Sequence, residues 1–571
     1  MTTGALSMAM VMKDQGVQRV FTFPGGTIAP LYDALSQVGI EIICARHEQG
    51  AGYMALAASR LTRCPQVVMV TSGPGATNLA TVIADAYYDS TALIAICGQV
   101  GTGDLFSGRK VRQLGFQEID CVGMMSGISK AAWQPKKAEE AADMLQKAFA
   151  LASNGRPGPV VLDLPMDVQR NEFEPDAQVV SPGSIELSEI PSPQPQAIAE
   201  SLRLLQKARQ PVILAGQGVL LSGATAELRS LAESLNIPVV CSLPGLGSIG
   251  GDSPLSLGFV GHTGNQYAAL AVHHADLLLV LGSRLDVRIT GSETETVASN
   301  GQIIRVDLDS NELNHSRVPA HLNIEADVKT YLDVLLGEID IKAASSTEKW
   351  LERINNWRQL HRLEVVPGKD RILPQTLIET VNRLTASQQV VVTTGVGSHQ
   401  HWAARHFTFD HPRRVFLTSA GHGAMGYDLP SALGAAIANN DHTVCCFAGD
   451  GSIQINIQEL QTMQDLNLPV KIFILDNSRL ALVSQFQLMN WPEDLTCGNK
   501  TNPDFAQLAA AYGIKSWRLE KPDDLESICE EALKHHGPAL VHCLIDPAAD
   551  IDPMLLGGQG LADMWTSSPK K

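Results

Sequence analysis

The chain has 571 residues, of which 44% are hydrophobic and 18% charged, and its formal net charge is −17. This composition excludes a wholly disordered chain, which needs few apolar and many charged residues, and the length favours three or four domains over one. A surface with this excess of acids repels phosphate backbones and anionic membranes, so we expect neither nucleic acid nor a membrane as partner.

The N-terminal segment and the cysteines predict a cytoplasmic protein. Residues 1–20 have no basic stretch ahead of their apolar residues and predict an amphipathic helix rather than a signal peptide. No apolar run approaches the ~20 residues that a bilayer-spanning helix needs. The ten cysteines are scattered without a CxxC pair, which favours reduced core cysteines over disulfides or a zinc site.

Short apolar runs alternate with longer helical stretches along most of the chain. Such runs, each ended by Gly, Asp or Ser, are typical of strands buried on both faces of a parallel sheet. Their alternation with helices predicts an α/β fold of doubly wound parallel sheets. We expect strands at 66–72, 92–99, 158–165, 211–218, 276–284, 302–309, 389–395, 443–451 and 471–477.

Two breaks divide this pattern. Residues 174–196 are rich in Pro, Ser and acids, and residues 338–372 carry a charged, helix-like stretch. The breaks predict three α/β domains, whose similar pattern hints at duplication of one unit. We place them at 1–175, 190–340 and 370–550, with a C-terminal tail at 551–571.

The segment 443–480 carries the most specific chemical signal. A predicted strand ends in Gly449, Asp450 and Gly451, a helical stretch follows, and a second strand ends at Asn477, 27 positions after Asp450. Ligands bind at the carboxyl ends of parallel strands, and the oxygens of Asp450 and Asn477 are hard donors suited to Mg²⁺. The glycines let the backbone approach a diphosphate, which the helix N–H groups would bind. A GDG turn alone is common, but the order of strand, helix and strand favours this site.

This arrangement resembles the metal and diphosphate signature of thiamine diphosphate (ThDP) enzymes. Such an enzyme also needs a carboxyl group hydrogen-bonded to atom N1′ of the aminopyrimidine ring, so that the exocyclic nitrogen can remove the weakly acidic C2 proton of the cofactor. The candidate is Glu48, which lies between a predicted strand and an Ala-rich helix in segment 43–60. The structural alternative is a glutamate placed there only by the helix dipole.

The chain resembles the catalytic subunits of acetohydroxyacid synthase (acetolactate synthase), and the likeness runs nearly from end to end. TSGPGATN and GDGS are shared by many ThDP enzymes, whereas GFQEID, GRPGP and the pattern RxDxRxTG are more selective. The segments that carry it are FPGGTIAPLYDAL (23–35), RHEQGAGYMA (46–55), TSGPGATN (71–78), GFQEID (115–120), GRPGPVVLDLPMDVQ (155–169), LPGLGSIGGDSPLSLGFVG (243–261), SRLDVRITG (283–291) and SAGHGAMGYDLPSALGAAIA (419–438).

The resemblance implies roles around the reacting centre. Glu48 would be the N1′ partner, while Gly25 and Gly26 would bring main-chain groups near the aminopyrimidine. Gln117 would act beside Phe116 in the reaction chamber. A further implied residue is Met425, whose side chain would bend the cofactor so that its amino group faces C2.

It also implies contacts to the rest of the cofactor and to the metal. Asp450, Asn477 and the main-chain carbonyl of Arg479 would bind Mg²⁺. The other implied ThDP contacts are Pro74, Asn78, Val396, Gly397, His399, Gln400, Gly423, Gly449, Gly451 and Ser452.

The middle domain resembles the FAD-binding module of this family. Without the resemblance, LAGQGV (214–219) is only a glycine-rich turn after a strand, and it fails the GxGxxG spacing. The implied flavin contacts are Arg156, Gly216, Gly218, His262, Thr263, Gly264, Arg284, Arg288, Asp307 and Asp327.

Four departures from the family pattern concern the acceptor substrate. Met166 replaces the usual Lys of a PKDV-like segment, Val287 replaces an acid beside the substrate-facing Arg288, and the loop 102–114 is longer. Phe486 stands for a tryptophan that favours 2-ketobutyrate, and a phenyl ring is smaller than an indole and offers no N–H. None of the four touches Glu48, so they put acceptor choice in doubt and leave the ThDP chemistry intact.

The resemblance implies a transferase that decarboxylates pyruvate and adds its two-carbon unit to a second 2-ketoacid, with ThDP, Mg²⁺ and FAD as cofactors. The first domain of one chain and the third of another would bracket the cofactor, in a homodimer or homotetramer. A small regulatory subunit is an open partner. Two alternatives also stay open: a ThDP enzyme with a different acceptor or a flavin-using pyruvate oxidase, and a silent structural or regulatory partner, against which the intact Glu48, Asp450 and Asn477 argue.

Overall fold

Three six-stranded sheets, all with parallel neighbours, make up the computed structural model of the chain. The structure describes residues 1–106, 108–174, 189–315, 317–340, 346–362, 370–439, 441–491, 498 and 501–564. The predicted boundary at 175, parts of both predicted breaks and residues 565–571 of the predicted tail lie outside these residues, and the predicted boundaries stay predictions. The α/β class with doubly wound parallel sheets is confirmed.

The first and third sheets share one strand order. The first runs β3-β2-β4-β5-β7-β6 and the third β16-β15-β17-β18-β20-β19, so each strand of one has a counterpart in the other. The strands of the first are β2 (Arg19–Thr22), β3 (Glu41–Cys44), β4 (Gln66–Val70), β5 (Leu93–Gln99), β6 (Ala131–Trp133) and β7 (Pro159–Pro165). Those of the third are β15 (Val390–Thr394), β16 (Arg414–Thr418), β17 (Thr443–Gly449), β18 (Lys471–Asp476), β19 (Lys515–Leu519) and β20 (Ala539–Leu544).

The middle sheet follows a different order, β11-β10-β9-β12-β13-β14. Duplication therefore fits the first and third sheets only. Its strands are β9 (Pro211–Ala215), β10 (Val239–Cys241), β11 (Ser256–Phe259), β12 (Leu277–Leu281), β13 (Gln302–Asp307) and β14 (Leu322–Glu325). A short antiparallel pair, β1 (Thr2–Thr3) and β8 (Glu172–Phe173), closes the first unit. All nine strands expected from the sequence are present.

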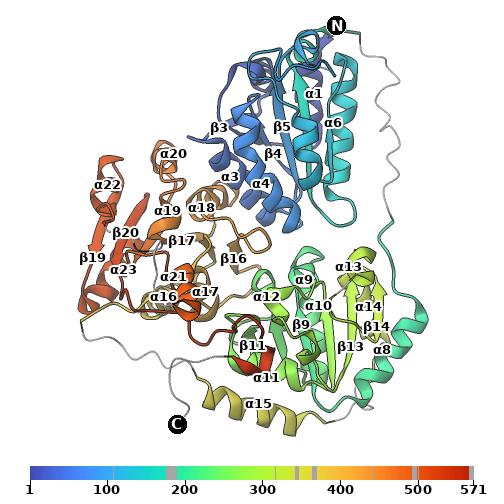
Figure 1. The fold of residues 1–571 in the computed structure, drawn as a ribbon, viewed down its shortest axis with the longest axis vertical. Coiled ribbons are helices and arrows are strands. Elements are labelled where there is room, and N and C mark those ends of the chain that lie inside the picture. The colour runs from blue at the N-terminus through green and yellow to red at the C-terminus, as the bar shows by residue number, and fades with distance from the viewer. Residues whose placement is uncertain are drawn as a thin grey trace.

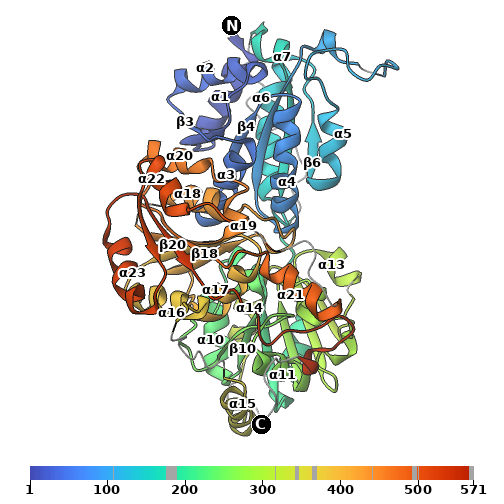
Figure 2. The same cartoon turned by 60° about the vertical axis from the view of Figure 1, so that its left-hand side comes forward.

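Helices cover both faces of each sheet (Figures 1 and 2). The first sheet carries α1 (Gly4–Asp14), α2 (Ala29–Val38), α3 (Glu48–Thr62), α4 (Pro74–Tyr88), α5 (Cys121–Met125), α6 (Ala138–Ser153) and α7 (Met166–Arg170). The middle sheet carries α8 (Pro195–Lys207), α9 (Gln217–Leu221), α10 (Thr225–Leu235), α11 (Gln266–His274), α12 (Val287–Thr290), α13 (Ser310–Asn314) and α14 (Val328–Glu338). The third carries α16 (Pro374–Leu384), α17 (Ser398–His406), α18 (Asp428–Ala438), α19 (Asp450–Ile453), α20 (Glu459–Asp465), α21 (Ala481–Asn490), α22 (Phe505–Ala511) and α23 (Leu525–Lys534).

Helices α3 and α18 join the first and third units in one core (Figures 1 and 2). Gly434 lets them approach closely, because a Cβ there would lie 2.2 Å from the carbonyl oxygen of Met54. The charged stretch predicted near residue 350 is α15 (Glu348–Leu360), and the tail folds back so that Leu555, Leu561 and Met564 pack with the middle sheet. Among the described residues, every helix is too short or too polar to traverse a bilayer.

The helix that the sequence predicts through residues 456–466 is present as α20, and the structure adds the short helix α19 directly after the GDG segment, with turns between the two. Asn456 lies in this break and donates its side-chain amide to Gln49 Oε1 at 2.9 Å and to the Gly426 carbonyl at 2.8 Å. An Asn with such partners favours a turn over a helix interior.

Candidate active site

Glu48 is the first residue of α3 and its carboxyl is buried. The backbone turns from β3 into the helix at His47, whose Nδ1 accepts a hydrogen bond from the Gln49 N–H at 3.1 Å. The side-chain amide of Asn78 donates to Glu48 Oε2 at 2.9 Å. A Cβ on Gly75 would lie 3.6 Å from Oε1. Glu48 is thus held by a fixed donor beside the glycine-rich turn that opens α4.

Two other predicted residues of the first unit, Gly25 and Gln117, lie against that turn. Gly25 is packed so tightly that a Cβ would lie 2.3 Å from the Cβ of Thr71, whereas the space beside Gly26 is open. Gln117 adopts a positive φ of 65°, and a Cβ on Gly73 would lie 2.9 Å from its carbonyl oxygen. Glu48, Asn78 and Gln117 therefore border one turn, while the neighbouring Phe116 is 84% exposed.

Asp450 and Asn477 follow the neighbouring strands β17 and β18, as the sequence predicts, and both are buried. One side-chain nitrogen, Asn502 Nδ2, donates to Asp450 Oδ2 at 2.6 Å and to Asp476 Oδ1 at 2.8 Å. The two carboxylates lie close enough to share one donor. Asn477 Oδ1 accepts from the main-chain N–H of Arg479 at 3.3 Å.

A buried histidine supports Asp476 from behind. His542 Nε2 lies 2.8 Å from Asp476 Oδ2. Burial alone would raise the pKa of Asp476, but the hydrogen bonds from His542 and Asn502 hold it below its usual value. This edge of the sheet therefore keeps negative charge for a cation at neutral pH.

The residue types at this edge fit a magnesium ion whose coordination shell is completed by the oxygens of a diphosphate. In the described part of the chain, no three His, Cys, Asp or Glu side chains gather as a metal site. The predicted set has one carboxylate, one amide oxygen and one main-chain carbonyl, so further oxygens must come from the ligand, as is usual for Mg²⁺.

The start of α17 presents polar atoms without partners. Ser398 Oγ, His399 Nε2 and Gln400 Oε1 are buried and have no hydrogen-bond partner among the described residues. Burial lowers the pKa of His399 to about 3, so the imidazole is neutral. A Cβ on Gly449 would lie 2.8 Å from His399 Nδ1, which ties this helix to the GDG segment. Unpartnered buried donors and acceptors of this kind fit a polar ligand such as a diphosphate.

The loop before α18 adjoins the same segment. The Gly426 N–H donates to Ser452 Oγ at 2.9 Å, and Met425 Cε lies 3.6 Å from where a Cβ on Gly451 would be. Gly423 has a positive φ of 73° with open space beside it. Within the third unit the structure thus brings His399 beside Gly449 and Met425 beside Gly451.

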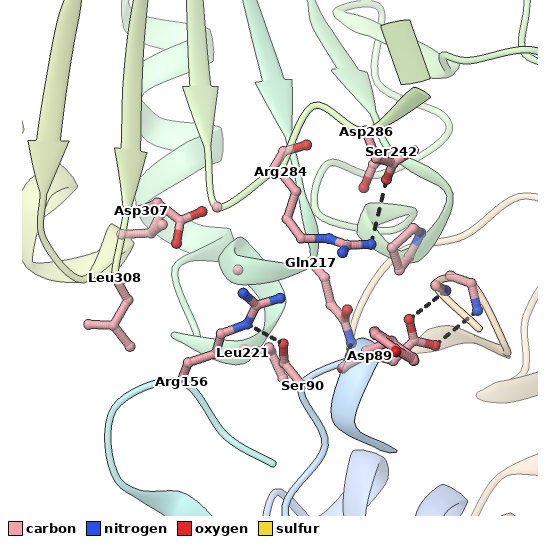
Figure 3. Close-up of a pocket in the computed structure, with 18 of the residues that line it drawn as sticks. Asp89, Ser90, Arg156, Gln217, Leu221, Ser242, Arg284, Asp286, Asp307 and Leu308 are labelled. Atoms are coloured by element: carbon pink, nitrogen blue, oxygen red, sulfur yellow. Dashed lines mark hydrogen bonds and ion pairs between the residues drawn. The ribbon is translucent and has the colours of Figure 1, made fainter. Parts of the chain in front are cut away.

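A cavity of about 350 Å³ opens at the carboxyl ends of β9, β12 and β13. Figure 3 shows Arg156, Arg284 and Asp307 pointing into it from different elements. Gly216, Thr263 and Gly264 are not among the lining residues. Of the predicted flavin contacts, those that line the cavity are Arg156, Gly218, His262, Arg284, Arg288, Asp307 and Asp327.

Charges of both signs line this cavity. Arg156 reaches across from the first unit to Asp309 at 3.1 Å and Glu312 at 2.7 Å. Burial, together with Arg288 and Arg405, lowers the pKa of His262 to about 3. Arginines suit a pyrophosphate and Asp307 at a strand end suits a ribose hydroxyl, so the donor set fits a dinucleotide such as FAD.

Sequence patterns missed several residues of these sites. Asn502 reaches Asp450 from a segment without any recognisable motif. Asp476 precedes Asn477, and its place at a strand end was the available signal. Asp89 lines the cavity and accepts the main-chain N–H groups of Ala420 at 2.9 Å and Gly421 at 2.7 Å (Figure 3), a contact between units that local spacing cannot reveal.

The residues that depart from the family pattern are either exposed at the surface or partly buried. Val287 is 53% exposed and Phe486 is 52% exposed. The Phe486 ring meets Trp491 edge to face with centroids 6.0 Å apart. Met166 opens α7. The inserted loop is tied to Glu118, which accepts the N–H of Leu114 at 2.7 Å.

Comparison with known proteins supports the same division of the chain. Three family models of thiamine pyrophosphate enzymes match: the N-terminal TPP binding domain at residues 2–124, the central domain at 198–335 and the C-terminal TPP binding domain at 395–543. The chain is 36% identical over 564 residues to the acetolactate synthase isozyme 2 large subunit of Escherichia coli K12, covering 98% of this chain and 99% of the relative. Isozyme 1 from the same organism is 38% identical, with 98% and 97% covered. The mitochondrial catalytic subunit of Aspergillus candidus is 35% identical, with 100% and 84% covered.

Proposed function

We propose a role for each site residue on one premise, which is that the chain belongs to the thiamine pyrophosphate enzyme family and, within it, to the acetolactate synthase large subunits. It is a ThDP-dependent carboligase that decarboxylates pyruvate and transfers the two-carbon unit to a second 2-ketoacid. ThDP, when bound, supplies the electron sink that lets the carbon–carbon bond of pyruvate break. The site residues described above bind and orient this cofactor and move protons around it.

Glu48 is the acid that exchanges a proton with the cofactor ring. Its carboxyl is buried at the first position of α3. Asn78 donates to Oε2, so that oxygen accepts and Oε1 is left to carry the proton toward a ligand. This hydrogen bond supports Oε1 as the oxygen that acts, and it is the single observation that carries the proposal.

The third unit binds the charged end of the cofactor. Asp450, Asn477 and the main-chain carbonyl of Arg479 hold Mg²⁺, and the N-terminal turn of α19 offers N–H groups to the diphosphate. His399, neutral through burial, and Gln400 donate or accept without adding charge. Met425 contributes an adaptable apolar wall beside Gly451.

The acceptor 2-ketoacid meets Arg288, whose planar guanidinium suits a carboxylate. Asp286 accepts the main-chain N–H of Arg288 at 2.8 Å and so fixes the start of α12. With Val287 at this position, no second acid lies beside Arg288. Gln117 and the exposed rings of Phe116 and Phe486 complete the chamber once a second chain covers these two rings.

FAD would bind in the cavity of the middle sheet. Arg156, Arg284 and Asp307 line that cavity and provide charge and hydrogen bonds for a dinucleotide. We propose no redox step for the flavin in the carboligase reaction. Because Asp89 lines the same cavity and accepts main-chain N–H groups from the third unit, a flavin bound there would stabilise the junction of the units.

The assembly brings two copies of the chain together. Phe116 and Phe486 are exposed apolar rings at the proposed chamber, and a homodimer or homotetramer covers them. The relatives are named as large or catalytic subunits, so a small regulatory subunit is proposed as a further partner.

The direct test is the reaction itself. Purified protein with pyruvate, ThDP and Mg²⁺ should form acetolactate, with CO₂ released in equal amount. Absence of any acyloin product with pyruvate alone and with every added 2-ketoacid or aldehyde would overturn the proposal.

A second candidate is a ThDP enzyme with another acceptor, which is favoured by the departures from the family pattern at Met166, Val287 and Phe486. A mass-spectrometric screen of 2-ketoacids and aldehydes with labelled pyruvate identifies the product. Oxygen uptake with peroxide release would instead indicate a flavin-using pyruvate oxidase.

A further inference from the structure

Glu459, the first residue of α20, is fully buried and reaches from the third unit into the first. Its carboxylate accepts the main-chain N–H of Arg46, at 3.0 Å to Oε1 and 3.2 Å to Oε2. Thr462 Oγ1 donates to Oε2 at 2.7 Å. Arg46 lies two residues before Glu48, so a side chain without a role in the function proposed above holds the backbone that presents Glu48.

The packing of this contact leaves the carboxylate no room to move. A Cβ on Gly50 would lie 2.1 Å from Glu459 Oε1, so the contact depends on glycine at that position. One turn earlier, Asn456 Nδ2 donates to Gln49 Oε1 at 2.9 Å. Contacts to Arg46, Gln49 and Gly50 therefore bracket Glu48 on both sides.

The contact between Glu459 and residues 46–48 is strong while the Glu459 carboxyl is charged, and protonation of that carboxyl weakens it. Burial raises the pKa of Glu459 to about 7, while hydrogen bonds from Thr462 and from the main-chain N–H groups of Arg46 and His47 oppose the rise. Hydrogen bonds from main-chain N–H groups to a carboxylate are stronger than those to a neutral group.

We propose that Glu459 is a positioning residue for Glu48: it clamps the main chain of residues 46–48 to the third unit and so fixes where the Glu48 carboxyl meets the cofactor. The inference rests on the proposed function in taking Glu48 as the acid that acts on ThDP. Glu459 itself touches neither substrate nor cofactor.

A neighbouring contact supplies the control. Asp465, on the same helix, forms an ion pair with the side chain of Arg46, and both side chains are more than two-fifths exposed. Such a surface pair contributes little. Asp465→Asn therefore removes a charge from the same helix and the same partner residue without touching the clamp.

The first experiment uses the protein without cofactor and measures amide hydrogen exchange. In Glu459→Ala, peptides covering residues 44–50 should exchange roughly tenfold faster, which corresponds to about 1.4 kcal/mol. Gly50→Ala should give the same change, because its methyl group displaces the Glu459 carboxylate. Glu459→Gln, which keeps one acceptor oxygen, should protect these amides better than alanine does, and Asp465→Asn should match the parent. Equal protection of 44–50 in the parent and in both alanine variants overturns the clamp.

The second experiment measures exchange of the C2 proton of bound ThDP by quench and NMR. A misplacement of the acid by about 1 Å can cost roughly a hundredfold, and we expect a loss of that size in Glu459→Ala, with glutamine restoring part of it. Because Glu459 acts through Glu48, the double variant with Glu48→Gln should be no slower than Glu48→Gln alone. Losses that multiply overturn the inference.

The two experiments separate this inference from the proposed function. If Glu48→Gln leaves C2 exchange unchanged, the proposed role of Glu48 fails and the inference fails with it. If Glu48→Gln slows the exchange but Glu459→Ala does not, although its thermal unfolding matches that of the parent, only the inference fails.

Discussion

Asp428 occupies in the third unit the place that Glu48 occupies in the first. Each is the first residue of a helix, α18 and α3, that follows the counterpart strands β16 and β3 of two sheets with one strand order. Both carboxyls are buried, and the two helices pack against each other. Burial raises the pKa of Asp428 to about 6. The quasi-equivalent acids thus have different partners: the side-chain amide of Asn78 donates to Glu48 Oε2, whereas the main-chain N–H of Leu429 donates to Asp428 Oδ1.

Glu48→Gln should abolish most of the activity. The amide cannot exchange the proton that the ring nitrogen needs, and general acid–base groups typically contribute about 10²–10⁴-fold. Acetolactate formation from pyruvate under saturating ThDP and Mg²⁺ measures the loss. Glu41→Gln, which alters an exposed partner of Arg19 on the preceding strand, serves as control. Full activity in Glu48→Gln would refute the assignment.

Removal of the metal should release the cofactor. Dialysis against a chelator is expected to abolish ThDP binding, and added Mg²⁺ should restore it in the parent but not in Asp450→Ala. Asn502→Ala should weaken Mg²⁺ activation by roughly 10–100-fold, the usual effect of removing a group that orients a metal ligand. Asn490→Ala removes an exposed amide that donates to the Phe486 carbonyl at 2.8 Å and is the matched control. Isothermal titration gives both affinities; unchanged binding in Asn502→Ala would count against the orienting role.

Flavin should bind in the cavity of the middle sheet. Gly218→Val places a side chain against Gly282, because even a Cβ at Gly218 would lie 2.6 Å from the Gly282 Cα. We expect this variant to purify without flavin absorbance, and Arg284→Ala to retain flavin roughly tenfold more weakly, a loss of about 1.4 kcal/mol. Gly337→Val, at an open position on α14, should keep the flavin of the parent. A parent protein that never binds FAD would exclude this cofactor.

Much of the architecture can be predicted from the sequence, because buried parallel strands are recognisable as continuous apolar runs. The order of the strands within a sheet cannot be predicted in this way, since the middle sheet has the same local sequence pattern as the other two and yet a different strand order. The buried places of Glu48 and Asp450 at the starts of α3 and α19 were predictable because their motifs are local. Asn502, Glu459 and Asp89 were not, because each acts on a segment from another part of the chain, and single-sequence spacing contains no information on such contacts.

The acceptor preference should respond to the ring at position 486. Phe486→Trp adds area and an N–H to the proposed chamber. We expect the ratio of 2-ketobutyrate to pyruvate as acceptor to rise by roughly tenfold, within the 1–3 kcal/mol that small changes in an apolar pocket provide. Competition between the two acceptors, with both products quantified by mass spectrometry, measures the ratio. Trp491→Phe alters the ring that meets Phe486 and controls for indirect effects; an unchanged ratio in Phe486→Trp would place residue 486 outside the chamber.

Stability should fall as the pH rises through neutrality, and Asp85 is one cause. Asp85 is fully buried beside Arg60, at 4.0 Å, but Arg60 makes its closer contact, at 2.9 Å, with Asp89. Burial and the negative charge of Asp89 raise the pKa of Asp85 well above its usual value, although Arg60 opposes them. The folded chain therefore holds a proton that the unfolded chain has already lost, so raising the pH favours unfolding between the ordinary carboxyl pKa and the raised one.

Asp85→Asn mimics the protonated acid and removes this titration. The difference in free energy of unfolding between Asp85→Asn and the parent should shift in favour of the variant by roughly 1–3 kcal/mol as the pH is raised from about 5 to about 8. This range is the usual cost of an unsatisfied buried group. Calorimetric melting temperatures at both pH values measure the change, at about 2–4 °C per kcal/mol for domains of this size. Asp143→Asn, at a part-exposed acid paired with Lys147, should keep the pH dependence of the parent. If Asp85→Asn keeps it as well, the junction of the three units holds Asp85 in its charged form, and another buried acid, such as Glu459 or Asp428, must account for any loss at high pH.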